Sequence, residues 1–263
     1  MVPFSAYSQY YDLLYQDKDY IGEVAYVSKL LLQFAEGSRS ILELGCGTGR
    51  HASLLAAAGF NVYGVELSDT MLQQSLTRAG EVLRARLPGS FHAIAGDARH
   101  VRVEKTFDAV VSLFHVVSYQ VSNDDIRQMF ETASVHLRAG GVFLFDVWYG
   151  PAVLKTHPGV RVKRIENDRI DVLRIAEPDV NLNKNLVHVN YSVLVTEKTT
   201  GALHRLTETH HMRYYFQPEL ELLAEQAGCH VIHAEEWLTS NAPSEHTWGV
   251  TFVARKKGLS TES

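Results

Sequence analysis

The stretch Ile41-Leu-Glu-Leu-Gly45-Cys-Gly47-Thr-Gly49-Arg50 constrains the fold most strongly. A short apolar run that ends in a glycine predicts a buried strand over residues 39–45. Glycines on alternate positions directly after it allow the backbone to pass very close to a ligand. A helix that begins near Arg50 would offer its free amides to the same ligand. The stretch therefore predicts a strand, a binding loop and a helix in succession.

Two common glycine-loop functions do not fit this loop. A dinucleotide-binding loop requires Gly-x-Gly-x-x-Gly, but the sixth position counted from Gly45 is Arg50. A phosphate-binding loop requires Gly-Lys-Ser/Thr, which is also absent here. The loop therefore predicts a ligand of another kind.

Acidic residues after neighbouring strands indicate what that ligand is. Glu43 places a carboxylate inside the first strand, where we expect it to point at the site and to favour an ammonium group over a phosphate. Glu66 ends the next predicted strand, where it can accept hydrogen bonds from a ribose diol. Asp97 and Ala98 follow the third strand and offer a carboxylate and an amide to an adenine edge. A nucleoside with a cationic, phosphate-free tail fits these groups, and S-adenosyl-L-methionine (SAM) is such a molecule.

The order of predicted elements favours an α/β fold with a doubly wound, mostly parallel sheet. Seven strands of the body are expected at residues 39–45, 61–66, 91–95, 107–113, 142–147, 231–237 and 248–254. Helices are expected at residues 7–16, 20–36, 50–58, from Ser68 or Asp69 onward, 124–137 and 217–227. Period-two alternation over residues 170–176, 187–195 and 203–215 predicts three antiparallel strands inserted before the last helix. We expect Ile21 and Leu76 to belong to the buried stripes of their helices.

We expect one domain over residues 1–263, built from three parts. Residues 1–38 form an N-terminal helical cap, and residues 39–150 and 217–256 form the α/β body that binds SAM. Residues 151–216 form a β-rich insert on the substrate side. Three antiparallel strands are too few for a secure separate domain, so we expect the insert to pack on the sheet or to form a lid.

Composition excludes several classes of protein. The 263 residues carry 25 Lys and Arg against 30 Asp and Glu, a net charge of −5, so no global field attracts nucleic acid. Cys46 and Cys229 are the only cysteines and form no disulfide framework. No signal peptide and no apolar run of roughly 18 residues is present, so we expect a cytoplasmic protein without a membrane segment. The 13 histidines complete no ligand set, and we expect no metal.

The glycine loop with Glu66, Gly96-Asp97-Ala98 and their spacing resembles the class I SAM-dependent methyltransferases, over roughly residues 7–150 and 217–256. The resemblance implies a seven-stranded, Rossmann-like methyltransferase sheet and SAM as the cofactor. The implied cofactor-binding residues are Tyr11, Tyr20, Glu43, Gly45, Cys46, Gly47, Gly49, Glu66, Leu67, Met71, Asp97, Ala98 and Leu113.

A narrower resemblance is to the sugar N-methyltransferases, which methylate the amine of nucleotide-linked deoxyamino sugars. The residues that carry it are Tyr11-Asp12-Leu-Leu-Tyr15, Lys18-Asp19-Tyr20, Ser112-Leu-Phe, Asp146-Val-Trp148-Tyr149-Gly-Pro151 and Pro243-Ser244. The chain departs from that family at three places. Ser118-Tyr119 replaces a glycine-histidine or glycine-tyrosine pair, Asp146 replaces a longer carboxylate, and His246 lies near the place of an arginine. These departures leave the acceptor open.

For amine methylation the acceptor has to lose a proton before it attacks the methyl group. Asp146 and Tyr119, at the carboxyl ends of adjacent strands, are expected to accept that proton or to orient the amine, and His115 is a further candidate. Substrate-binding residues are expected to be Tyr7, Trp148, Tyr149, His246 and Trp248. An O-methyltransferase for a small molecule and a SAM-binding protein without transferase activity remain alternatives. The oligomeric state stays open, with a homodimer among the possibilities.

Overall fold

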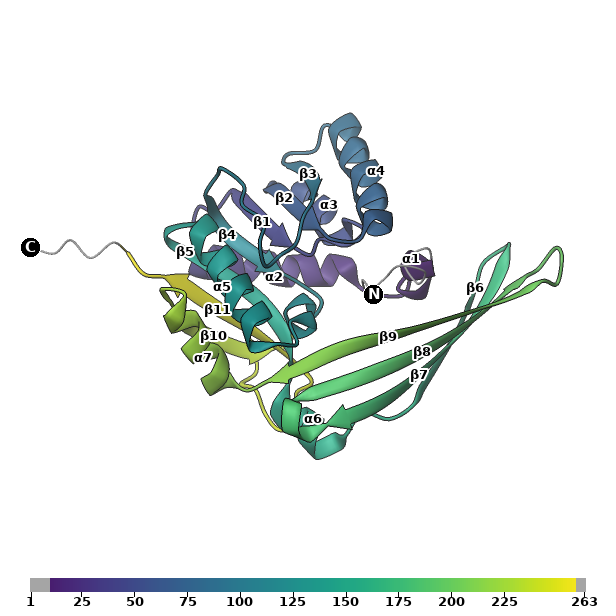
Figure 1. Ribbon diagram of the computed structural model, residues 1–263. Helices are drawn as coiled ribbons and strands as arrows, with labels where there is room; N and C mark the ends of the chain where they lie inside the picture. The colour runs from purple at the N-terminus through teal and green to yellow at the C-terminus, as the bar shows by residue number, and fades with distance from the viewer. Residues whose placement is uncertain (1–9, 259–263) are drawn as a thin grey trace, which may run out of the picture.

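The computed structural model describes residues 10–258, and its centre is a seven-stranded sheet (Figure 1). Its strands are β1 (Ser40–Leu44), β2 (Asn61–Glu66), β3 (Ser90–Ala95), β4 (Phe107–Ser112), β5 (Leu137–Tyr149), β10 (Cys229–Glu236) and β11 (Gly249–Lys256). The order across this part of the sheet is β3-β2-β1-β4-β5-β11-β10. β1 to β5 are parallel, whereas β11 is antiparallel to both β5 and β10. The doubly wound α/β fold expected from the sequence is thereby confirmed.

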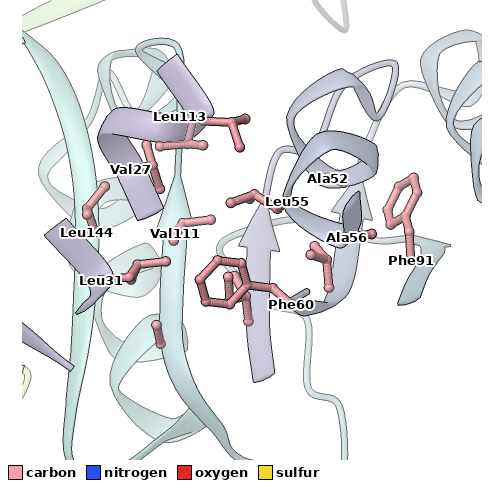
Figure 2. Close-up of a cluster of buried hydrophobic side chains, with 14 of the residues drawn as sticks. Val27, Leu31, Ala52, Leu55, Ala56, Phe60, Phe91, Val111, Leu113 and Leu144 are labelled. Carbon is pink, nitrogen blue, oxygen red and sulfur yellow. The ribbon is translucent and has the colours of Figure 1, made fainter. Parts of the chain in front are cut away.

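Helices cover both faces of this sheet, which explains why its central strands are continuous apolar runs. One face packs against α2 (Tyr20–Phe34), α3 (Arg50–Ala57) and α4 (Asp69–Ala85), and the other against α5 (Asn123–His136) and α7 (Gln217–Gln226). Neighbouring residues of β1 divide between the two cores, since Ile41 belongs to the first and Leu42 to the second. Figure 2 shows the first core, in which Val27 and Leu31 of α2 and Leu55 of α3 approach Val111 of β4.

The insert contains four strands rather than the three expected. They are β6 (Arg161–Glu166), β7 (Ile170–Asn181), β8 (Leu186–Glu197) and β9 (Leu203–Tyr215), each antiparallel to the next. β6 was missed because its sequence, Arg-Val-Lys-Arg-Ile-Glu, is mostly charged and exposed at the edge of the sheet. The short helix α6 (Gly150–Thr156), which begins with a glycine and a proline, was also missed.

The insert continues the central sheet at one point. β9 pairs in parallel with the end of β5, through Trp148 with Tyr214 and Tyr149 with Tyr215. β11 already occupies the other edge of β5 at Trp148, opposite Gly249. β9 therefore lies on the β4 edge of β5, beyond the last β4 pair, Ser112 with Phe145. This arrangement places the insert over the carboxyl ends of the parallel strands, and Figure 1 shows it as a long arm beside the body.

The N-terminal helix α1 (Tyr11–Leu14) packs against this arm. Leu14 is completely buried in a small apolar cluster with Val172, Val193 and Val195 of β7 and β8. α1 is shorter than the expected helix over residues 7–16, and Tyr7 lies outside the described residues. The cluster fastens the N-terminal segment to the far part of the insert.

Three local expectations were wrong. Ile21 and Leu76 are 74% and 42% exposed, because each lies outside the buried stripe of its helix. The segment Ala139-Gly140-Gly141, between the helix expected over residues 124–137 and the strand expected over residues 142–147, is not a loop. It is part of β5, which begins at Leu137 opposite Phe107 and then shifts register before Val142 pairs with Ala109. The extra β5 residues form an irregularity in the pairing with β4, which the apolar pattern of the sequence does not show.

Leu14→Ala should lower the free energy of unfolding by about 2 kcal/mol or more, since it leaves a cavity in a buried cluster. Ile21→Ala is the matched control, and its exposed position should limit the change to about 0.5 kcal/mol. Urea unfolding followed by circular dichroism measures both variants. Equal losses in the two variants would contradict the packing of α1 on the arm.

Candidate active site

A cavity of about 450 Å³ lies at the carboxyl ends of β1, β2, β3 and β4, beneath α1 and the insert. It brings together most of the site residues expected from the sequence. Those that line it are Tyr11, Tyr20, Gly45, Cys46, Gly47, Glu66, Leu67, Met71, Asp97, Ala98, Leu113, His115, Tyr119 and Trp148. Six expected residues do not line it, namely Glu43, Gly49, Asp146, Tyr149, His246 and Trp248.

The glycine loop forms one wall of the cavity, and its conformation requires glycine. Gly45 and Gly47 have φ values of +78° and +56°, a left-handed conformation that other residues adopt rarely. A Cβ atom on Gly45 would also lie 2.6 Å from the Val116 side chain, too close for any real contact. Gly47 has open space on the cavity side, where only the Met71 sulfur lies within 4 Å of an added Cβ. The loop therefore presents bare backbone to the cavity.

Glu66 is held rigidly at the end of β2. Its Oε2 accepts a hydrogen bond from the Gly47 amide and its Oε1 one from the Ser68 amide, both at 2.8 Å. Burial raises its pKa above the usual value, although these backbone hydrogen bonds oppose the shift. Each carboxylate oxygen keeps a further lone pair for a ligand in the cavity.

Glu43 and Gly49 were expected to face the ligand, and the structure places them elsewhere. Glu43 still lies inside β1, paired with Gly64 and Val111, so its side chain is buried against the sheet rather than beyond its end. Burial, and then the charge of Glu66, raise the pKa of Glu43 to about 8. Gly49 is the N-cap of α3, and an added Cβ there would meet Phe91 at 2.8 Å. Its role is to let the helix pack closely on β3.

Asp97 lines the cavity but is already paired. Arg99 donates hydrogen bonds from Nε to both Asp97 oxygens, at 2.9 and 3.1 Å, and reaches Asp125 at 2.5 Å. Burial would raise the pKa of Asp97, but the hydrogen bonds and charge of Arg99 lower it below its usual value. Arg99 and Asp125 line the same end of the cavity. The sequence analysis missed this pair because Asp125 belongs to α5, which is distant from Arg99 along the chain.

The N-terminal segment, whose Tyr11 lines the cavity, is held against the glycine loop through Asp12. Its carboxylate accepts a hydrogen bond from Thr48 Oγ1 at 2.9 Å and forms ion pairs with Arg50 and Arg78. The Arg50 guanidinium also lies over the Tyr20 ring, 5.1 Å from its centre. α1 is therefore fastened to the glycine loop on one side and to the insert on the other. Further lining residues that the sequence analysis missed are Tyr15, Thr48, Arg50, His51, Ser68, Phe114, Gln120 and Val121.

The loop after β4 has a strained backbone that faces the cavity. Phe114 and His115 both adopt left-handed conformations, with φ values of +64° and +62°, which non-glycine residues rarely do. The turn is stabilised by a hydrogen bond of 3.0 Å from the His115 amide to Asp146 Oδ2. The 3-10 turn η2 (Val116–Tyr119) follows and carries the Tyr119 side chain to the cavity. Such strain is typical of functional sites.

His115, and not Asp146, presents its side chain to the cavity. Asp146 is 1% exposed and lies within β5 opposite Thr251, so its carboxylate is behind the His115 ring. His115 Nδ1 is 2.6 Å from Asp146 Oδ2, an ion-pair distance, although the ring N–H direction does not meet hydrogen-bond geometry. The expectation that Asp146 itself reaches the ligand is therefore corrected.

Of the described residues that were expected to bind the substrate, only Trp148 lines the cavity. Its ring meets the Trp248 ring edge to face, with centres 6.1 Å apart, so Trp248 supports the wall from behind. Tyr149 packs on the apolar core beneath α5 and α7. The His246 side chain is 70% exposed beside Glu245, well outside the cavity.

The insert supplies four lining residues that the sequence analysis did not identify as a site, namely Tyr191, His210, His211 and Met212. His210 is buried with Nδ1 2.8 Å from Tyr119 Oη. A signal was present in the sequence, since period-two alternation places Glu208, His210 and Met212 on one face of β9. Nothing in that pattern shows which other element the face meets.

Within residues 10–258 no group of three or more His, Cys, Asp or Glu side chains is arranged to hold a metal ion. In the same part of the chain, no helix is both long enough and apolar enough to cross a membrane.

The cavity suits SAM. The bare backbone of the glycine loop permits the close approach of a ligand, and Glu66 presents a fixed carboxylate where a ribose diol would lie. The buried Glu66 carboxylate, which lines the cavity, favours a cationic ligand over a phosphate.

Comparison with known proteins agrees with this geometry. Residues 41–141 match the family model described as a methyltransferase domain. The chain is a SAM-dependent methyltransferase, and its cofactor is SAM, as the sequence led us to expect.

Among its relatives is the dTDP-3-amino-3,4,6-trideoxy-alpha-D-glucopyranose N,N-dimethyltransferase of Streptomyces venezuelae. It is 28% identical over 228 residues, which cover 86% of this chain and 90% of the relative. A putative methyltransferase of a Geobacillus strain is 27% identical over 96% of this chain and 99% of its own length. Among solved structures, a SAM-dependent methyltransferase from Clostridium acetobutylicum has a TM-score of 0.78 at 21% identity, covering 95% of this chain and 97% of its own. DesVI from Streptomyces venezuelae has a TM-score of 0.75 at 25% identity, covering 95% and 98%.

Glu66→Gln should weaken SAM binding roughly 10- to 100-fold, because hydrogen bonds to a charged acceptor are worth about 1.5–3 kcal/mol. Isothermal titration calorimetry with SAM measures the change. Glu81→Gln, on the exposed side of α4, is the matched control and should bind like the wild type. Unchanged affinity in Glu66→Gln would remove Glu66 from the cofactor site.

Glu43 should make the stability of the ligand-free protein fall with rising pH. Its pKa is about 8 in the folded protein and near 4.5 in an unfolded chain, so the folded state binds more protons between these values. Glu43→Gln removes this contribution. The free energy of unfolding of the variant minus that of the wild type should therefore increase from about pH 4.5 to about pH 8. Urea unfolding at several pH values measures it. If the free energies of unfolding of the two proteins changed with pH in the same way, the prediction that Glu43 has a raised pKa in the folded protein would be wrong.

Proposed function

We propose that the protein transfers the methyl group of SAM to the amine of a nucleotide-linked deoxyamino sugar. The main observation that supports this proposal is a single cavity, which is lined both by the cofactor residues around Glu66 and by the polar side chains of His115, Tyr119 and His210. Three relatives named as N,N-dimethyltransferases of dTDP-amino sugars support this substrate class. The matches to two of them extend over more than four fifths of this chain.

The cofactor end of the cavity would be formed by residues of α1, α2, β2 and α4 and of the loops that follow the parallel strands. We assign the ribose to Glu66, the methionine tail to the backbone of Gly45 and Gly47, and the adenine to the neighbourhood of Asp97 and Ala98. Tyr11, Tyr20, Cys46, Leu67, Met71 and Leu113 complete this end. The N-terminal segment, fastened by Asp12, excludes water from it.

The acceptor end would orient the amine for in-line attack. The bound cofactor supplies an activated methyl group, and the protein has to hold a neutral amine roughly 3 Å behind it. His115 Nδ1 lies against Asp146, which leaves Nε2 for the cavity. We assign to Nε2 a hydrogen bond that orients the amine, and to Asp146 the positioning of the ring. Trp148 would close this end against solvent.

Acceptor specificity is the decisive test. Purified protein is incubated with labelled SAM and dTDP-3-amino-3,6-dideoxy-α-D-glucopyranose, together with the dTDP-sugar that carries a hydroxyl in place of the amine. Methylation of the amino sugar alone, observed by mass spectrometry, is the expected result. Methylation of the hydroxyl sugar would support the O-methyltransferase alternative instead, and no transfer to any amine would overturn the proposal.

The remaining expectations about partners belong with this proposal. A small-molecule acceptor, rather than nucleic acid, is consistent with the net charge of −5. A cytoplasmic location and a homodimer stay predictions.

Asp146→Asn should lower kcat roughly 10²-fold, because the His115 ring loses the charge that positions it, while SAM affinity stays near that of the wild type. His115→Asn should cause a similar loss. The double variant should lose little more than either single variant, since the two residues act as a unit. Steady-state kinetics and calorimetry measure these effects, with the exposed Asp124→Asn as control. Fully additive losses would contradict the coupling.

A further inference from the structure

A largely buried lysine contacts two of the aromatic rings that line the cavity. The Lys18 side chain is 12% exposed, and its ammonium group forms an ion pair with the Glu23 carboxylate. Its Nζ lies 4.3 Å from the centre of the Tyr20 ring and 4.3 Å from the centre of the Phe114 ring. Both rings line the cavity, whereas Lys18 and Glu23 do not. Lys18 is therefore part of the support of the site and not of its surface.

The body of the protein fixes the position of the ammonium group. Oε2 of Glu23 lies 2.7 Å from Nε2 of His51 in α3, and both residues are buried. Val24, next to Glu23 in α2, belongs to the apolar core beneath the sheet. Asp19 is the N-cap of α2 and accepts a hydrogen bond from the amide of its first turn, so Lys18 directly precedes a capped helix.

The turn that contains Phe114 and His115 needs support from its surroundings. Two consecutive non-glycine residues with φ values of +64° and +62° cost free energy, which other contacts have to offset. One such contact is the hydrogen bond from the His115 amide to Asp146 Oδ2. The Phe114 ring receives two more, from the Lys18 ammonium group and from the Tyr15 ring, which meets it edge to face with centres 5.2 Å apart.

The position of the Phe114 ring affects the ring of His115. The two rings stack, with centres 5.6 Å apart and an interplanar angle of 29°. His115 lines the acceptor end of the cavity, next to Phe114. A displacement of the Phe114 ring would therefore also displace the His115 imidazole.

The charges around Lys18 come from α2, from its N-cap and from β5. Burial lowers the pKa of Lys18, although the charges of Glu23, Asp146 and Asp19 oppose this. Burial would raise the pKa of Glu23, but the hydrogen bond from His51 and the charge of Lys18 lower it below its usual value. Glu23 is therefore ionised at neutral pH and supplies the counter-charge of the ammonium group.

We propose that Lys18 is a positioning residue for methyl transfer, which holds the turn of Phe114 and His115 in the conformation that orients the His115 ring toward the acceptor. This role rests on the proposed function, in which His115 orients the acceptor amine. Lys18 acts through the Phe114 ring, because an ammonium group is attracted to the face of an aromatic ring and burial strengthens the attraction. An uncharged side chain of the same length would pack beside the ring without this attraction.

Steady-state kinetics test the role of the charge. With dTDP-3-amino-3,6-dideoxy-α-D-glucopyranose as acceptor, Lys18→Met should lower kcat roughly 10-fold. The KM for SAM should stay within a few-fold of the wild type, since Arg50 and His51 still hold the Tyr20 ring. Lys18→Arg keeps a cation for the ring and for Glu23, and it should recover most of the lost kcat. Lys29→Met, at an exposed position of α2, is the matched control and should behave like the wild type.

A double variant separates the contact with Phe114 from the charge left on Glu23. Lys18→Met combined with Glu23→Gln leaves no unpaired carboxylate and should show the same loss of kcat as Lys18→Met alone. Wild-type kcat in the double variant, or an equal loss in Lys18→Arg and Lys18→Met, would overturn the proposal.

A second measurement does not depend on methyl transfer. Hydrogen exchange followed by NMR reports on the turn through the His115 amide, which donates to Asp146. In the ligand-free protein this amide should exchange roughly 10-fold faster in Lys18→Met than in the wild type, while the amides of β1 exchange at unchanged rates. An unchanged rate at His115 removes Lys18 as the support of the turn, even where kcat falls. If the wild type methylates no amine, the proposed function fails, and the exchange rate still decides whether Lys18 holds the turn.

Discussion

The parallel pairing of β9 with the last residues of β5 is the constraint on which the site depends. Only two residue pairs form it, but β11 blocks the opposite edge of β5 and β4 ends at Ser112. β9 can therefore lie only over the carboxyl ends of the parallel strands. Because of this contact, the cavity is lined by the glycine loop on one side and by residues of the insert on the other. Without it, His210 and Tyr119 would belong to separate surfaces.

The charges of the cavity are arranged in two ways. At the cofactor end, Glu66 is fixed by backbone amides and Glu43 lies buried behind it without a hydrogen bond to Oε2 among the described residues. Burying charge is costly unless a partner is present, so the Glu66 carboxylate, which lines the cavity, favours a cationic ligand. At the acceptor end, Asp146 and Glu208 each lie behind a histidine rather than in the cavity. Both histidines line the cavity, while their carboxylates stay buried.

Sequence reasoning predicted the body well and the insert less well. The seven strands of the body came out correctly because parallel strands buried on both faces are unbroken apolar runs between helices. β6 was missed because an exposed edge strand does not need an apolar pattern. Glu66, Asp97 and Ala98 were placed at the cavity because each lies at the end of a parallel strand or just after it. Asp146 was misjudged because β5 continues to Tyr149, three residues beyond it, so its side chain never passes the strand end.

The sequence by itself determined the glycine loop, the acids after the strands and the class of cofactor. These features are local, since residue type and spacing along one strand–loop–helix unit decide them. Tertiary structure alone decided that His115 covers Asp146 and that His210 meets Tyr119. Periodicity shows which residues of a strand share a face, but it does not show which element that face will meet. That choice depends on which strand edges are open once the sheet has formed, and here the edge of β5 beyond β4 was the one that β9 occupied.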